Sequence, residues 1–194
     1  VFFLVPVGRG TLVEGLTAEQ YELVFAKLYE LSRAAPFIIK VTEALHYRRY
    51  VLQRQTEERR RDGIPSASPT APPAERWYGH GGGPHGSIGR SPQVINAGKG
   101  HCFISSIGEV YPSGFLPLTA GNIREAGLAQ LYRTSPLFLA LRDPDLLKGR
   151  CGRCEFRASC GGSRSRAFAV TGDFLAEDPC CAYVPTAHLD SALT

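Results

Sequence analysis

One stretch decides the fold: it reads Cys151-Gly-Arg-Cys154-Glu-Phe-Arg-Ala-Ser-Cys160-Gly-Gly-Ser-Arg164, and an adjacent pair, Cys180-Cys181, follows it. The first three cysteines have the spacing C-x2-C-x5-C. Two cysteines in a C-x2-C turn point their sulfurs to one side, where soft thiolates can converge on zinc or on an iron–sulfur cluster. One thiol of the later pair would complete four ligands. The alternative is a disulfide with free thiols, and we favour a metal or cluster because nothing in the sequence indicates an oxidising compartment.

The bulk composition is that of an ordinary globular protein. The chain has 194 residues, of which 43% are hydrophobic and 21% charged, enough for one core or two small units. The net charge of +4 is spread along the chain, and no basic strand interleaved with aromatic residues appears. No apolar run approaches the roughly 18 residues of a membrane span, and the N-terminus lacks the basic flank of a signal peptide. We therefore expect a cytoplasmic protein without nucleic-acid or membrane partners.

The N-terminal part has the pattern of a βαβ unit. Val1–Val7 is a continuous apolar run, which predicts a strand covered on both faces. Thr17-Ala-Glu-Gln20 is a capping box that opens an amphipathic helix over residues 17–34, and Pro36 ends it. A second strand is expected over residues 37–42. Two parallel strands joined by a right-handed crossover follow from this order.

Candidate ligand-binding residues follow both predicted strands, at the strand ends where α/β folds bind ligands. Gly8, Arg9 and Gly10 form a glycine-rich loop, for which an ordinary strand-to-helix turn is the alternative. Glu43 and His46 follow the second strand, and their alternative is a helix start with solvated charges. The residues alone leave these alternatives open.

Residues 63–96 are rich in Pro, Gly and Ser, which predicts a linker between a first unit, 1–62, and a second unit, 97–194. In the second unit, the residues around Ser106-Ile-Gly108 predict a β-hairpin. One helix is expected to follow Asn122, a second to begin at Pro136 and a third to span 163–170, with Gly172 as its C-cap. The helix after Asn122 would be built on Ile123, Leu128, Leu131 and Tyr132.

The second unit resembles the SPASM/twitch auxiliary domain of radical S-adenosylmethionine (SAM) enzymes. The resemblance rests on the hairpin Cys102-Phe-Ile-Ser-Ser-Ile-Gly108-Glu-Val-Tyr-Pro112, on Gly121-Asn122-Ile-Arg124 and on the cysteine loop. Around that loop, the chain is similar to the branch of haem and haem d1 maturation enzymes, through Cys160–Ala167, Thr171-Gly-Asp173 and Glu177-Asp-Pro-x-Cys181. Val5–Gly10 and Thr42–Arg49 resemble the last strands of that family's partial (βα)6 barrel.

The resemblance implies an α/β fold, in which the C-terminal strands and helices of a partial (βα)6 barrel precede a small α+β SPASM-like iron–sulfur domain. It implies one auxiliary [4Fe-4S] cluster, whose ligands would be Cys151, Cys154, Cys160 and Cys181. Cys180 is the alternative fourth ligand, and Cys181 is preferred because the family pattern is Asp-Pro-x-Cys.

The pattern for a second cluster is incomplete in this chain. Ser113 and Arg164 take the positions of two cysteines of the full SPASM pattern. Cys102 is then expected to be a buried apolar thiol, with a role as ligand as the lesser alternative.

The C-x3-C-x2-C motif, which in this family binds the SAM-cleaving cluster, occurs nowhere in the sequence. The chain also contains no methionine, so Val1 is not a start residue. Either the protein was trimmed or this is the C-terminal portion of a longer enzyme with the rest of the barrel upstream, and we expect the second. We do not expect this chain alone to cleave SAM.

The complete enzyme would use SAM, an external electron donor and a tetrapyrrole or peptide substrate. Gly8–Gly10 would border the SAM pocket, and Glu43 and His46 the substrate. The auxiliary cluster would conduct electrons, with a potential tuned by charges for which Arg153, Arg157 and Arg164 are candidates. The rival interpretation is a non-enzymatic zinc-binding or electron-carrier module, although zinc sites usually pair two short knuckles and Cys180-Cys181 is an awkward second half.

Overall fold

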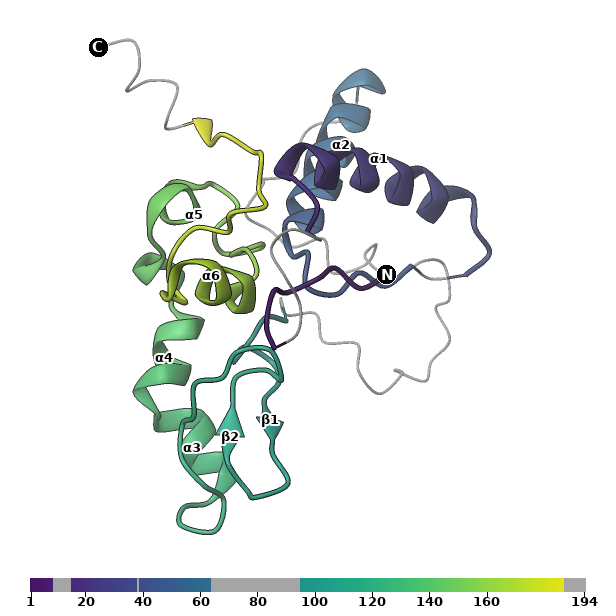
Figure 1. Ribbon diagram of the computed structural model, residues 1–194. Coiled ribbons are helices and arrows are strands. Elements are labelled where there is room, and N and C mark those ends of the chain that lie inside the picture. The colour runs from purple at the N-terminus through teal and green to yellow at the C-terminus, as the bar shows by residue number, and fades with distance from the viewer. Residues whose placement is uncertain (9–14, 38, 64–94, 187–194) are drawn as a thin grey trace, which may run out of the picture.

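The computed structural model describes residues 1–8, 15–37, 39–63 and 95–186. It combines helices with one small sheet (Figure 1), in agreement with the mixed α and β character expected from the sequence. The elements in chain order are α1 (Ala18–Ala34), α2 (His46–Arg61), β1 (Phe103–Ile104), β2 (Val110–Tyr111), α3 (Leu128–Thr134), α4 (Pro136–Arg142), the 3-10 turn η2 (Pro144–Leu146), α5 (Gly149–Arg153) and α6 (Arg164–Thr171). Within these ranges, no helix combines the length and the apolar character needed to cross a membrane.

The capping box predicted for α1 is confirmed. The Thr17 hydroxyl accepts the Gln20 N–H at 3.3 Å, and the Gln20 side chain accepts the Thr17 N–H at 2.8 Å. The helix ends at Ala34, before Pro36, and its buried face packs against α2. That face and its partners form an aromatic core of Phe3, Tyr21, Phe25, Leu28, Tyr29, Tyr47 and Val51.

The two predicted N-terminal strands pair through one parallel bridge, Phe2 with Thr42. The Phe3 N–H donates to the Thr42 carbonyl at 3.0 Å, and the Thr42 N–H donates to the Val1 carbonyl at 3.0 Å. The expectation that both faces of the first strand are covered is wrong for this chain, because Phe2 and Leu4 are 54% and 39% exposed. Alternate residues of a strand face opposite ways, and only Phe3 and Val5 reach the core.

The hairpin of the second unit is confirmed, with Phe103 opposite Tyr111 and Ile104 opposite Val110. The expected helix start after Asn122 is wrong, since α3 begins only at Leu128. The Asn122 side chain instead braces a turn, because it accepts the Arg124 N–H at 3.0 Å and donates to the Ile107 carbonyl at 3.1 Å. An asparagine side chain that hydrogen-bonds to nearby backbone groups stabilises a turn in place of a helix.

Local signals place the next helices correctly. Pro136 opens α4 at its first position. Ser163 caps α6, its hydroxyl accepting the Arg166 N–H at 3.1 Å. Gly172 ends α6 in the left-handed conformation with φ of 76°, which a glycine adopts without strain.

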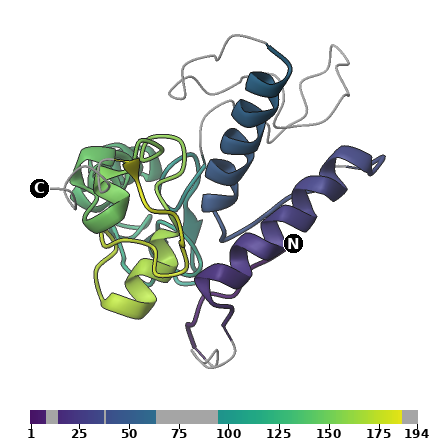
Figure 2. The same cartoon turned by 90° about the horizontal axis from the view of Figure 1, so that it is seen from above.

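The N-terminal helices and the C-terminal segments meet directly. In Figure 2, α1 and α2 lie on one side of the molecule, and the hairpin and α3–α6 lie on the other. The first turns of α1 and α2 point toward that second group. Arg166 of α6 donates to the Glu43 carbonyl at 2.8 Å and to the Tyr21 hydroxyl at 3.0 Å. Most of the predicted linker lies outside the described residues, but Asn96 at its end is buried and donates to the Gly162 carbonyl at 3.0 Å.

Candidate metal centre

Four cysteines line one pocket, which encloses about 420 Å³ of empty space, part of it continuous with solvent. Cys151 lies within α5, Cys154 directly follows it, Cys160 comes from the next turn and Cys181 from the returning segment. No three His, Cys, Asp or Glu side chains in the described ranges lie close enough together to hold a single metal ion. The four thiols therefore share a pocket without forming a ready-made one-ion site within the described residues.

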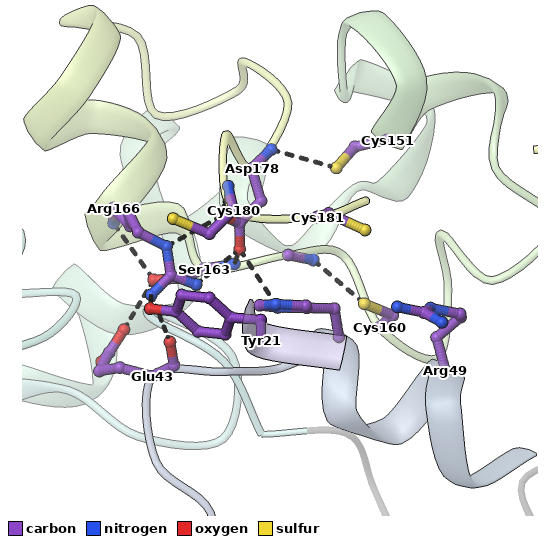
Figure 3. Close-up of polar contacts among 12 residues, drawn as sticks. Tyr21, Glu43, Arg49, Cys151, Cys160, Ser163, Arg166, Asp178, Cys180 and Cys181 are labelled. Carbon is purple, nitrogen blue, oxygen red and sulfur yellow. Dashed lines mark hydrogen bonds and ion pairs between the residues drawn. The ribbon is translucent and has the colours of Figure 1, made fainter. Parts of the chain in front are cut away.

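The adjacent cysteines 180 and 181 have different surroundings. Figure 3 shows their sulfurs pointing in opposite directions. Cys181 lines the pocket, whereas Cys180 packs against the N-terminal aromatic core and its thiol lies 3.9 Å from the Leu16 carbonyl. Cys102 is half-buried rather than fully buried, and it does not line the pocket.

Glycines at two positions let the cysteine loop close tightly. A Cβ at residue 152 would lie 2.1 Å from the Leu147 carbonyl oxygen. Gly162 has φ of 62°, and a Cβ there would lie 2.7 Å from Nη2 of Arg164 and 2.8 Å from Cβ of Asp178. Neither position has room for a side chain. These contacts explain the glycines inside the C-x2-C turn and after the third cysteine.

Each of the four thiols faces a backbone N–H group. The Cys151 sulfur accepts the Asp178 N–H, as Figure 3 shows, and the sulfurs of Cys154 and Cys160 accept the N–H groups two residues further along, all at 3.4 Å. The Tyr183 N–H, likewise two residues on, lowers the pKa of Cys181 against the larger effect of burial. Hydrogen bonds of this kind favour the thiolate over the thiol.

Burial acts in the opposite direction and dominates. It raises the pKa of Cys151, Cys160 and Cys181, and it raises the pKa of Cys154 to about 12, with smaller contributions from Glu155 and neighbouring thiols. Buried thiolates need a positive partner, and a coordinated metal deprotonates its thiol ligands outright. The chemistry of this donor set thus fits a metal centre with four thiolate ligands.

His46 lines the same pocket, although the sequence pattern associates it with a substrate site. The ring is fully buried, and within the described structure neither ring nitrogen has a hydrogen-bond partner. Its Nδ1 lies 3.6 Å from Oδ2 of Asp178. Burial lowers the pKa of His46 to about 4, Asp178 opposes the shift, and Arg166 and Arg49 add to it. The imidazole is therefore neutral at pH 7.

Arg49 and Tyr183 also form the pocket wall, and the sequence did not single them out. Arg49 is 4% exposed, pairs with the Glu22 carboxylate and lies 5.0 Å from the centre of the Tyr183 ring. The sequence did contain one signal for Arg49. It lies three residues after His46, and residues three apart share one face of a helix.

A buried ion pair, Arg166 with Asp178, lies at the wall of the pocket. Asp178 is fully buried and accepts two hydrogen bonds from Arg166, both at 2.9 Å, and the Ser163 N–H at 2.8 Å (Figure 3). Burial alone would raise the pKa of Asp178, but Arg166 and His46 hold it well below its usual range. The carboxylate is therefore ionised, and the adjacent N–H of the same residue contacts Cys151.

Glu43 lies at the contact between the two halves of the chain, not in the thiol pocket. It adopts φ of 59°, which is uncommon for a residue with a side chain. Its carboxylate accepts the Ser163 hydroxyl at 2.7 Å, and burial raises its pKa. Gly8 is exposed with φ of 62°, and Arg9 and Gly10 of the predicted SAM loop lie outside the described residues.

Comparison with known proteins identifies relatives along nearly the whole chain. An AdoMet-dependent heme synthase from Methanosarcina barkeri is 39% identical over 185 residues, which cover 95% of this chain and 48% of the relative. A second one, from Oleidesulfovibrio alaskensis, is 35% identical over 187 residues, covering 95% of this chain and 43% of the relative. This chain is a homologue of radical SAM/SPASM enzymes. No protein-family model matches it.

A further radical SAM/SPASM relative, a pre-heme d1 synthase from Dinoroseobacter shibae, is 38% identical over 100 residues, half of this chain. The chain spans about half the length of the AdoMet-dependent heme synthases that it matches. The cysteine pocket therefore lies in a chain that is homologous to part of a radical SAM/SPASM enzyme.

The buried neutral His46 predicts a pH dependence of stability. In the unfolded chain, His46 takes up a proton near its ordinary pKa of about 6.5. In the folded chain, His46 does so only near pH 4. The unfolded state binds more protons between these values, so the free energy of unfolding is expected to fall by up to about 3 kcal/mol as the pH drops through this window. Urea unfolding at pH 7 and pH 5 measures the effect. A His46→Gln variant that keeps the full pH dependence would contradict it.

Proposed function

We propose that this chain is a portion of a radical SAM/SPASM enzyme that modifies a tetrapyrrole, in which one auxiliary [4Fe-4S] cluster is bound by Cys151, Cys154, Cys160 and Cys181. The observation that carries the proposal is the pocket of four thiols, one of them fully buried and three half-buried, each facing a backbone N–H. When bound, such a cluster supplies one-electron chemistry. The sequence supports a cluster over a zinc ion, because zinc sites usually pair two short knuckles and the adjacent Cys180-Cys181 is an awkward second half.

The chain's own residues would hold this centre and set its environment. The backbone N–H groups stabilise negative charge on the four sulfurs. Phe156 and Tyr183, whose rings pack edge to face at 5.7 Å, add aromatic surface to the pocket wall. Neutral His46 adds no charge to the pocket at pH 7.

A chain of hydrogen bonds leads from the pocket toward the predicted substrate side. It passes from the Cys151 sulfur to the Asp178 N–H, from the Asp178 carboxylate to Arg166, and from Arg166 to the Glu43 carbonyl. Glu43 directly follows Thr42, whose backbone pairs with Phe2. We propose that this end of the strand pair is the end of a partial barrel and that electrons pass between it and the pocket.

The coverage of the relatives favours a tetrapyrrole over a peptide. The AdoMet-dependent heme synthases align with 95% of this chain. The PqqA peptide cyclases align with 33–35% of it, and the mycofactocin maturase MftC with 41%. A peptide substrate is the alternative within the same family.

Several further assignments stay predictions. These are the border of the SAM pocket at Gly8, Arg9 and Gly10, the contact of Glu43 and His46 with substrate, an external electron donor, and the division into units 1–62 and 97–194 with a linker between them.

Stepwise reduction after anaerobic reconstitution with iron and sulfide tests the proposed function. We expect visible absorption that bleaches reversibly on one-electron reduction, together with a paramagnetic signal in the reduced state. A colourless protein that shows neither change, and that binds zinc instead, would identify the rival zinc module.

A further inference from the structure

We propose that Arg164 is the counter-cation of the thiol pocket and raises the reduction potential of the cluster bound there. This inference rests on the proposed cluster. Arg164 is only 1% exposed, and its Nη2 lies 3.8 Å from the Cys151 sulfur. Cys151 also accepts the Asp178 N–H, so two donors converge on its sulfur, one of them charged. Hydrogen bonds and charges at ligand sulfurs are among the factors that set cluster potentials.

The guanidinium is held in one place. Its Nη1 donates to the carbonyls of Phe174 and Ala176 at 2.9 and 2.7 Å, and its Nε lies 3.5 Å from the Gly162 carbonyl. The nearby glycine leaves room for Nη2, since a Cβ at residue 162 would lie 2.7 Å from it. A cation fixed in this way acts on the pocket without moving.

The charge of Arg164 has no acidic partner within the described structure. No carboxylate there lies within ion-pair distance of it, whereas Arg166 pairs with Asp178 and Arg49 with Glu22. Arg164 makes only a small contribution to lowering the pKa of Asp173. Asp173 forms its own 2.6 Å ion pair with Lys148. A buried charge without an opposite charge is costly. When the proposed cluster is bound, the thiolate of Cys151 would be the negative charge that Arg164 directly faces.

This arrangement distinguishes Arg164 from another arginine near the cysteines. Arg157 lines the pocket, whereas Arg164 reaches it only through the Cys151 sulfur. However, the Arg157 side chain is 43% exposed and pairs with Asp145 at 3.1 Å. Solvent and that partner screen its charge. Reduction adds one negative charge to the centre, and an unscreened cation beside Cys151 stabilises the reduced form more than the oxidised form.

The test compares reduction potentials of the whole reconstituted chain, measured by titration with the paramagnetic signal as readout. Arg164→Gln is expected to shift the one-electron equilibrium at least tenfold toward the oxidised form, which is about 59 mV. Arg164→Lys keeps the charge and should shift it less. The matched control is Arg142→Gln, because Arg142 also donates to three carbonyls, those of Phe138, Tyr132 and Arg133, but contacts no thiol. Its potential should equal that of the wild type.

Thermal unfolding with and without the cluster separates charge compensation from a structural role. Charge compensation predicts that Arg164→Gln lowers the melting temperature of the loaded chain more than that of the metal-free chain. A variant that melts normally without metal but retains no cluster also supports it. An unchanged potential, an equal loss in both forms, or a metal-free variant that does not fold would overturn it. A wild-type chain that binds no iron would instead refute the proposed function, and this inference with it.

Discussion

Replacing Asp178 by asparagine is expected to lower the free energy of unfolding by about 3–5 kcal/mol. The substitution removes one charge of a fully buried pair and leaves Arg166, itself 2% exposed, without its acid. It keeps the shape of the side chain and the N–H that contacts Cys151, so the loss reports on the charge. Arg166 also contacts Tyr21 and Glu43, and the variant should therefore loosen the contact between the two halves of the chain.

Urea unfolding at neutral pH measures this effect, with Asp145→Asn as the matched control. Asp145 pairs with Arg157 on the surface and is 75% exposed at its side chain, so its loss should cost no more than about 1 kcal/mol. Equal stability losses in the two variants would contradict a dominant role for the buried pair. Because Arg166 and His46 hold the pKa of Asp178 below its usual range, the stabilisation is present above about pH 3.9 and is lost on further acidification.

Replacing Cys181 by serine is expected to abolish most of the iron and sulfide uptake, whereas Cys180→Ser should retain it. The two residues are neighbours in sequence, but only Cys181 lines the thiol pocket. The Cys180 thiol faces the Leu16 carbonyl and the aromatic core. The pair therefore offers an internal control, with the same substitution at adjacent positions.

Iron content and visible absorption after anaerobic reconstitution measure this difference. Full uptake in Cys181→Ser combined with loss in Cys180→Ser would exchange the two assignments. Full uptake in both variants would show that neither cysteine is the fourth ligand.

Much of the helical structure follows from local signals in the sequence. The capping box at Thr17, the proline at position 136 and the glycine at position 172 each mark a helix end through contacts within a few residues. The wrong helix start after Asn122 has a local cause as well, since the Asn122 side chain bonds to the hairpin turn around Ile107. Periodicity alone does not reveal that competing contact.

The candidate site was predictable only in part, because its walls come from distant segments. The cysteine spacing indicated three of the pocket thiols, and a resemblance to a family favoured Cys181 over Cys180. The contacts of Arg166 with Tyr21 and Glu43 join residues more than 100 positions apart. No short pattern reports such contacts, so the place of His46 beside the thiols required the structure.

Iron and acid-labile sulfide per chain, measured after anaerobic reconstitution, test the central proposal most directly, with Cys154→Ala as the control. We expect about four of each in the wild type and a clear loss in the variant, as for a single [4Fe-4S] cluster held by four thiolates. Roughly one zinc per chain with no sulfide would contradict the proposal and indicate a structural metal module.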